Sequence, residues 1–171
     1  MANTGGTILV TGASRGIGRA TSNRLTRGGH DVIGLARNPP EDKFVGEFHA
    51  VDLADRSATA AMLEEIATGV EITGLVNNVG INRVQSLGEV DLDVFDEIID
   101  INLRTAIQCA QAVLPGMKAR GYGRIVNISS RAALGREGRT GYSAAKAGVI
   151  GMTRTWALEL AEHGITANAV A

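Results

Sequence analysis

Short apolar runs recur along the chain, and each is followed by a turn that is polar or rich in glycine. Because these runs lack strict polar alternation, they are typical of parallel strands that are buried on both faces. Between them, apolar residues recur three or four positions apart, which predicts helices with one buried stripe. The pattern predicts strands at residues 7–11, 31–36, 48–51, 74–77, 124–130 and 166–170, and helices at 19–27, 57–67, 92–119 and 142–162.

Strands that alternate with helices at this interval indicate successive β-α units and a parallel sheet. We expect one domain over residues 1–171, with a doubly wound (Rossmann-like) α/β fold, right-handed connections and the strand order 3-2-1-4-5-6. Ser57 is expected near the amino-terminal cap of the second helix, and His163 and Gly164 at the end of the last one. The stripe of helix 92–119 is expected to contain Phe95, Ile98, Ile99, Leu103, Ile107, Ala110 and Leu114, and that of helix 142–162 Val149, Met152, Trp156 and Leu160.

The composition excludes several classes of function. With 20% charged residues and a formal net charge of -1, the chain has no electrostatic footprint for nucleic acid or an anionic membrane. No apolar run approaches the roughly 20 residues of a membrane span, and residues 1–6 lack the charged-then-apolar order of a signal peptide. The single cysteine, Cys109, excludes an intrachain disulfide. We therefore expect a cytoplasmic protein with no metal site and no nucleic-acid or membrane partner.

The first predicted strand runs directly into a glycine-rich turn, residues 12–18, that precedes a helix. Glycines let a backbone approach a pyrophosphate closely, and a helix amino end offers unpaired N–H groups and a positive dipole end. The spacing is Gly-x-x-x-Gly-x-Gly, which differs from the common Gly-x-Gly-x-x-Gly fingerprint. The turn is therefore either a phosphate-binding loop or a tight connection between a strand and a helix.

The end of the second strand bears on the choice of cofactor. In dinucleotide-binding folds, an acidic residue about 20 positions beyond the glycines holds the ribose 2′-hydroxyl, whereas an arginine suits a 2′-phosphate. Here Ala36 occupies the acidic position, Arg37 follows it, and Arg15 lies in the glycine turn. A solvated arginine is common at a strand end, but the missing carboxylate and the two arginines together favour NADP(H) over NAD(H).

Tyr142 and Lys146 lie one helical turn apart, so their side chains leave the same face of the last helix. A tyrosine hydroxyl with an ordinary pKa of about 10 is a poor proton shuttle at neutral pH, and a nearby ammonium favours the phenolate form. Tyr142 is therefore a candidate general acid/base. The alternative is an interfacial tyrosine beside a solvated lysine, and the spacing alone does not separate the two.

Three more polar residues are candidates for the site. Ser129 and Ser130 close the fifth strand, at the edge where ligands of open α/β sheets bind. Asn102 falls inside a predicted helix, where an asparagine competes for backbone hydrogen bonds. From the residues alone, Asn102 is more simply an exposed polar side chain.

The ordered motifs at residues 11–18, 52–53, 77–80, 102, 127–130, 142–146 and 168–170 resemble the short-chain dehydrogenase/reductase family, most closely its acyl-carrier-protein reductase-like and sugar or alcohol dehydrogenase-like members. The resemblance implies that Tyr142 donates or accepts the proton, while Lys146 favours its ionised form and holds the nicotinamide ribose. It also implies that Ser130 hydrogen-bonds the substrate carbonyl and that Asn102 supports a water-linked proton relay. The implied cofactor residues are Gly12, Ser14, Arg15, Gly16, Ile17, Gly18, Arg37, Asp52, Leu53, Asn78, Val79 and Gly80, together with Tyr142 and Lys146.

Three departures from the family pattern affect this assignment. Val79 replaces the usual alanine, which adds two methyl groups beside the adenosine half of the site and which we expect to be tolerated. Ser130 precedes Tyr142 by one residue less than the commoner family spacing, which would select Ser129. Because the Asn-x-Ser-Ser strand motif aligns without a gap on Ser130, we place the missing residue in the following loop. Family members also continue with Pro-Gly, a substrate-covering segment and a seventh strand, which do not follow Ala171 in this sequence.

The resemblance therefore predicts NADP(H)-dependent oxidoreduction of a small-molecule carbonyl or secondary alcohol, or of an acyl thioester. The rival is a catalytically weak or idle dinucleotide-binding protein, such as a sensor or assembly partner, because the substrate segment is missing. The loop before Tyr142 carries three arginines, at positions 131, 136 and 139, which are either solvated or attract an anionic substrate or an acidic carrier protein. The family also implies a homo-oligomer, a dimer formed through helices 92–119 and 142–162.

Overall fold

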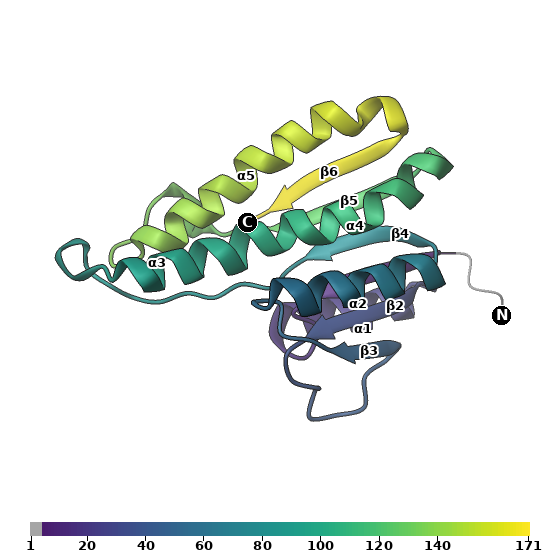
Figure 1. Cartoon of the computed structure of the whole chain (residues 1–171), viewed down its shortest axis with the longest axis horizontal. Coiled ribbons are helices and arrows are strands. Elements are labelled where there is room, and N and C mark those ends of the chain that lie inside the picture. Colours follow the sequence, from purple (N-terminus) through teal and green to yellow (C-terminus); the bar gives the residue numbers. More distant parts are fainter. Residues whose placement is uncertain (1–4) are drawn as a thin grey trace.

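The computed structural model describes residues 5–171, which form a six-stranded parallel sheet with helices on both faces (Figure 1). The predicted strand order, 3-2-1-4-5-6, is confirmed. The expectation that residues 1–6 form no signal peptide falls mostly on residues 1–4, which lie outside the described residues. The strands are β1 (Thr7–Thr11), β2 (Asp31–Ala36), β3 (Glu47–Ala50), β4 (Ile72–Asn77), β5 (Gly123–Ile128) and β6 (Ile165–Val170). The helices are α1 (Gly16–Arg27), α2 (Arg56–Gly69), α3 (Leu92–Ile99), α4 (Thr105–Arg120) and α5 (Thr140–Leu160).

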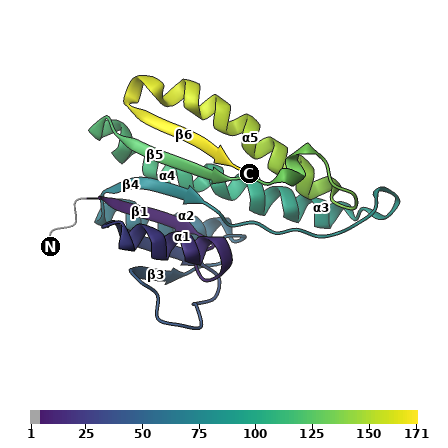
Figure 2. The ribbon, with the colours of Figure 1, turned by 180° about the vertical axis from the view of Figure 1, so that it is seen from behind.

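The helices divide between the two faces of the sheet. α2, α4 and α5 cover one face, and α1 covers β1 and β2 on the other (Figures 1 and 2). On the α1 side, none of the helices within residues 5–171 lies over β5 and β6 (Figure 2). Val126 and Ile128 are accordingly only half-buried there, and Val170 is 54% exposed.

The helix ends follow local hydrogen bonding. Asp55, rather than Ser57, caps α2, because its carboxylate accepts the backbone N–H groups of Ser57 and Ala58, both at 2.9 Å. The last helix ends at Leu160 and continues as a short 3-10 turn that Gly164 closes at φ +67°, which confirms the predicted end.

The predicted helix 92–119 is wrong only in being uninterrupted: residues 92–120 are helical throughout, but a π-helical turn (Asp100–Arg104) separates α3 from α4. The Asn102 amide donates to the carbonyl oxygens of Ile98 at 2.8 Å and Ile81 at 2.9 Å. Asn102 is 3% exposed, so the simpler expectation of an exposed side chain is also wrong. The wider turn is how the helix accommodates an asparagine that bonds sideways to a neighbouring loop.

The π-helical turn also shifts the buried stripe relative to the prediction. Of the residues predicted to be buried, Ile98 and Ala110 are, whereas Ile107 is 40% exposed. The predicted stripe therefore lies at the border of the buried face. There Leu103 packs close to Gly148 of α5, and a Cβ added at Gly148 would lie 3.1 Å from the Leu103 side chain. The buried positions of this segment are Ile98, Ile101, Asn102, Thr105, Ala106, Cys109, Ala110, Val113 and Met117.

The main core lies between the sheet and the layer of α2, α4 and α5. It is built around fully buried side chains such as Leu9, Leu75, Ile125 and Met117. Cys109 belongs to this core, and burial raises its pKa to about 12, so it remains a thiol that packs as a small apolar group. In α5, Val149 and Leu160 are buried as predicted, whereas Trp156 and Met152 are half-buried, with Trp156 packed against the core.

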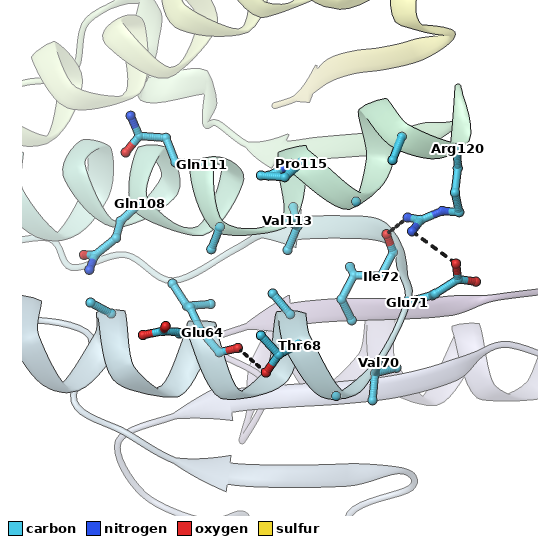
Figure 3. A pocket seen from close by; sticks show the side chains of 17 residues that line it. Glu64, Thr68, Val70, Glu71, Ile72, Gln108, Gln111, Val113, Pro115 and Arg120 are labelled. Atoms are coloured by element: carbon cyan, nitrogen blue, oxygen red, sulfur yellow. Dashed lines mark hydrogen bonds and ion pairs between the residues drawn. The ribbon is translucent and has the colours of Figure 1, made fainter.

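A hollow of about 850 Å³ lies between α2 and α4, with Leu63, Val113 and Ile72 among the apolar residues that line it (Figure 3). At one end, Arg120 donates to the carbonyl oxygen of Ile72 at 2.5 Å and lies 3.7 Å from the Glu71 carboxylate. Ile72 begins β4, so this hollow lies toward the amino ends of the strands, away from the edge where α/β sheets bind ligands.

No helix within residues 5–171 is long and apolar enough to span a bilayer. The cytoplasmic location expected from the sequence stays a prediction.

Candidate active site

A cleft of about 730 Å³ lies at the carboxyl edge of the sheet, a volume typical of small-molecule sites. Four loops contribute to it, those that follow β1, β2, β3 and β4. The structure brings together nine of the predicted cofactor residues as its lining: Gly12, Ser14, Arg15, Arg37, Asp52, Leu53, Asn78, Val79 and Gly80. Gly16, Ile17 and Gly18 do not line it but form the first turn of α1, whose amino end follows the lining residues Ser14 and Arg15. Tyr142 and Lys146, the other two predicted cofactor residues, do not line it either.

The glycine turn leads into α1 three residues earlier than predicted. Gly18 is required there, because a Cβ at this position would overlap the carbonyl oxygen of Gly12 and lie 2.6 Å from the Asn78 amide nitrogen. Arg15 is the N-cap residue, makes no side-chain cap hydrogen bond, and the first turn of α1 contains no acidic residue. The backbone N–H groups and the positive end of the helix dipole are therefore not neutralised by a carboxylate, which suits a phosphate.

Thr11 and Asn78 fasten the glycine turn to the end of β4. The Asn78 amide donates to the carbonyl oxygens of Thr11 at 3.0 Å and Gly12 at 3.3 Å. In return, the Thr11 hydroxyl accepts from the backbone N–H groups of Asn78 at 3.0 Å and Val79 at 3.1 Å. The Asn78 side chain thus shapes the loop, and Thr11 is a supporting residue that sequence reasoning did not single out.

The arginines at the far end of the cleft differ in their availability. Arg19 donates to the carbonyl oxygen of Lys43 at 2.6 Å and stacks 5.0 Å from the centroid of the Phe44 ring. Arg15 and Arg37 are exposed, and the side chain of neither makes a hydrogen bond or ion pair with other residues of the range 5–171. Both are free to meet an anion, beside Ala36 at the end of β2.

Lys146 is buried rather than solvated. It is 3% exposed, its Nζ donates to the carbonyl oxygen of Ile128 at 2.7 Å, and this nitrogen lies 5.7 Å from the centroid of the Tyr142 ring. Burial lowers its pKa to about 8, because desolvation disfavours the ammonium form. The expectation of a solvated lysine is therefore wrong, while the role of Tyr142 beside it stays a prediction.

Gly80 is where the cleft meets the polar residues of the two long helical segments. A Cβ at Gly80 would lie 2.5 Å from Asn102 Oδ1 and 3.4 Å from Lys146 Nζ. Asn102 Oδ1 is itself buried and has no hydrogen-bond partner among the described residues. The site therefore keeps an unused acceptor beside a buried amine, at one corner of the cleft.

The two serines at the end of β5 differ in their partners. Ser129 is 5% exposed, and its hydroxyl donates to the backbone carbonyl oxygen of Lys146 at 2.9 Å. Ser130 is half-buried, and its hydroxyl accepts from the Ala132 N–H at 3.1 Å, which leaves its proton available. Ser130 is thus better placed to donate to a ligand than Ser129.

Sequence reasoning missed several residues that line the cleft, among them Ala54, Ile81 and Ile101. Ala54 and Ile81 directly follow predicted motifs and could have been found by extending each motif one residue. Ile101 lies in the π-helical turn, which the sequence pattern did not predict. No group of three or more His, Cys, Asp or Glu side chains within residues 5–171 could hold a metal ion.

A family model described as short chain dehydrogenase matches residues 6–171 of this chain. The chain belongs to the short-chain dehydrogenase/reductase family, as its motifs predict.

Its relatives include the short-chain reductase protein NovJ of Streptomyces niveus, 39% identical over 175 residues that cover 95% of this chain and 66% of that protein. The 3-oxoacyl-acyl-carrier-protein reductase FabG of Vibrio harveyi is 38% identical over 174 residues, covering 95% and 70%. A crystal structure described as an NAD(P)-dependent gluconate 5-dehydrogenase from Beutenbergia cavernae, with NADP at low occupancy, matches with a TM-score of 0.91 and 34% identity. That match covers 96% of this chain and 70% of the other. The chain spans just under two thirds of the length of NovJ, at 66%, and 70% of the length of the Vibrio harveyi reductase.

Proposed function

We propose that this chain is an NADP(H)-dependent oxidoreductase that interconverts a carbonyl and a secondary alcohol, with Tyr142 as general acid/base. The observation that carries the proposal is the convergence at Gly80, where the buried Lys146 amine and the unpartnered Asn102 oxygen adjoin the cleft. Tyr142 stands one helical turn before Lys146, with its ring beneath the amine nitrogen.

The cleft fits a dinucleotide. Gly80 supports this fit, because any larger residue would occupy the space beside Asn102 and Lys146. The amino end of α1 would hold the pyrophosphate, and Arg15 and Arg37 would hold the 2′-phosphate of NADP(H). Asp52 and Leu53 would lie against the adenine end, and Lys146 would hold the nicotinamide ribose. When bound, the nicotinamide would supply or accept a hydride at the substrate carbon.

Each polar residue then has a separate task at the substrate oxygen. In the reductive direction, Tyr142 gives its hydroxyl proton to that oxygen, and Ser130 donates a hydrogen bond that stabilises its developing negative charge. The Lys146 ammonium favours the tyrosinate that remains. Asn102 Oδ1 offers an acceptor for a water that returns a proton to the pair.

The substrate class is a small-molecule carbonyl or an acyl thioester. The reductases among the relatives support this choice, since FabG of Vibrio harveyi is named as a 3-oxoacyl-acyl-carrier-protein reductase. Arg131 and Arg136 are exposed on the loop between Ser130 and α5, which would suit an anionic substrate or an acidic carrier. We also propose a homodimer through α4 and α5, since Ile107 and Leu158 leave apolar surface exposed on these helices.

The test is to follow the absorbance of NADPH while the chain meets a panel of ketones and 3-oxoacyl thioesters. Oxidation of NADPH that depends on both the protein and one class of carbonyl would support the proposal. If NADPH binds but no carbonyl on the panel oxidises it, the rival assignment, an idle dinucleotide-binding protein, replaces it.

A further inference from the structure

A cluster of charged side chains connects the cofactor cleft to the π-helical turn Asp100–Arg104. The Arg104 guanidinium donates to both carboxylate oxygens of Asp100, from Nε to Oδ1 at 3.0 Å and from Nη2 to Oδ2. The same Nη2 donates to the carbonyl oxygens of Leu53 at 2.9 Å and Ala54 at 3.3 Å. One guanidinium therefore joins the turn to the loop that follows β3.

Both ends of this connection reach the site. Leu53 and Ala54 line the cleft on one side, and Ile101, in the π-helical turn, lines it on another. Asn102, the next residue, places its unpartnered oxygen beside Gly80. π-helical turns are rare overall, and those that occur are often found at functional sites. Here the Arg104 side chain connects such a turn to a loop that lines the cleft.

The rest of the cluster strengthens the same connection. Arg104 Nη1 donates at 2.8 Å to the side-chain oxygen of Gln108, whose amide donates at 2.8 Å to the carbonyl oxygen of Arg56. Arg56 also donates to Asp100 at 2.8 Å, but its side chain is 73% exposed, so this contact contributes little. Arg104 and Asp100 are 19% and 24% exposed and carry the connection. The hydrogen bond from Arg104 lowers the pKa of Asp100, which keeps the carboxylate ionised at neutral pH.

We propose that Arg104, acting with Asp100, is a positioning residue that couples occupation of the adenine end of the cleft to the placement of Asn102. This inference rests on the proposed function, because it takes the cleft to hold a dinucleotide. A ligand against Leu53 and Ala54 would restrict the motion of their loop. Because the Arg104 guanidinium binds the carbonyl oxygens of that loop and the Asp100 carboxylate at the same time, the π-helical turn would become more ordered as well. A lysine has a single ammonium and cannot span the carboxylate and the two carbonyl oxygens.

Hydrogen exchange of the whole chain tests the coupling, with adenosine 2′,5′-bisphosphate as the probe because it carries the adenine end of NADP without nicotinamide. In the wild type, saturating probe should slow exchange both in the glycine turn, residues 12–18, and in residues 98–104. We expect slowing of about fivefold or more in residues 98–104, the lower end of typical coupling strengths. In Arg104→Lys, the glycine turn should still be protected while the effect on residues 98–104 disappears.

Two further variants keep the result interpretable. Arg120→Lys makes the same exchange on α4 at an arginine that also binds a backbone carbonyl, and it should behave as the wild type. Asp100→Asn weakens the same connection from its other end and should repeat the Arg104→Lys result. Undiminished slowing of residues 98–104 in both Arg104→Lys and Asp100→Asn would overturn the coupling. Wild-type protein whose glycine turn is not protected by the probe would instead overturn the dinucleotide assignment itself.

Discussion

The Lys146 amine nitrogen lies 5.7 Å from the centroid of the Tyr142 ring, and it is held there by a 2.7 Å hydrogen bond to the carbonyl oxygen of Ile128. The lysine thus has two fixed partners in a position that is almost closed to solvent. Burying an ammonium has a cost, which Lys146 shows as a pKa lowered to about 8. A residue that destabilises the fold in this way is more readily explained by a role at the site than by packing.

The first prediction is that the unfolding free energy of the unliganded protein rises with pH because of Lys146. Its pKa is about 8 in the folded chain against an ordinary lysine pKa of 10.5 in the unfolded chain, so between these values the unfolded chain binds more protons and stability increases with pH. The gain between pH 7 and 9 should be about 1 kcal/mol. Cys109, with a pKa raised from 9.0 to about 12, works in the opposite direction, and because half of the unfolded thiols are ionised at pH 9 it removes about 0.4 kcal/mol of the Lys146 gain by that pH.

Urea unfolding at pH 7 and 9 measures this effect. Between pH 7 and 9, the unfolding free energy of the wild type should rise more than that of Lys146→Met. Lys118→Met, which removes an exposed lysine from α4, should show the same rise as the wild type. An equal change in unfolding free energy with pH in the wild type and Lys146→Met would mean that Lys146 is not buried as an amine in solution.

The second prediction concerns cofactor choice. Arg15 and Arg37 are exposed, unpaired within residues 5–171, and border the cleft, so each can meet a 2′-phosphate. Hydrogen bonds to charged groups contribute roughly 1.5 to 3 kcal/mol each, so NADPH should bind about ten-fold to several hundred-fold more tightly than NADH. Titration of both cofactors by intrinsic fluorescence measures the ratio.

Substitutions distinguish a direct contact between these arginines and the 2′-phosphate from a general effect of positive charge on the protein. Arg15→Ala with Arg37→Ala should bring the NADPH to NADH ratio close to one, whereas Arg27→Ala, at the far end of α1, should leave it unchanged. A wild-type preference for NADH would reverse the assignment.

The third prediction concerns the loop that follows Ser130. Arg136 is exposed, so Arg136→Glu should lower kcat/KM for an anionic substrate and flatten its dependence on ionic strength. The matched change Arg154→Glu, at an exposed position on α5, should do neither. If the two variants respond alike at two salt concentrations, the loop is merely solvated.

The fourth prediction concerns assembly. Leu158 on α5 is 82% exposed, and burial of this side chain in a dimer through α4 and α5 would explain an apolar residue at that position. Leu158→Glu should convert a dimer to a monomer in light scattering. Leu87→Glu serves as a control because Leu87 is also 82% exposed but lies outside both helices. A wild-type monomer would remove the case for this interface.

Much of the fold and part of the site could be predicted from the sequence for a simple physical reason. Buried parallel strands leave apolar runs, and the glycines at 12, 16 and 18 mark a turn at the end of one of them. Tyr142 and Lys146 could be paired because a helix fixes the direction of residues four apart.

What escaped prediction depends on contacts between distant segments. Asn102 lies in a π-helical turn and its amide reaches the carbonyl oxygen of Ile81, and no local pattern records that contact. The same holds for the buried hydrogen bonds from Asn77 to Asn127 at 2.8 Å and from Asn127 to Thr153 at 2.9 Å, which fix α5 against the sheet. Polar residues of this kind look exposed in sequence and become structural only when the sheet assembles.

The most direct measurement of the central claim compares the wild type with Tyr142→Phe and Tyr122→Phe in NADPH oxidation by the carbonyl that the panel identifies. A general acid contributes about a hundred-fold to ten-thousand-fold to the rate. Tyr142→Phe should therefore lose at least a hundred-fold in kcat while binding NADPH as the wild type does, and Tyr122→Phe, at a tyrosine between α4 and β5, should lose nothing. A Tyr142→Phe variant that turns over at close to the wild-type rate would show that Tyr142 is not the proton donor and would contradict the account.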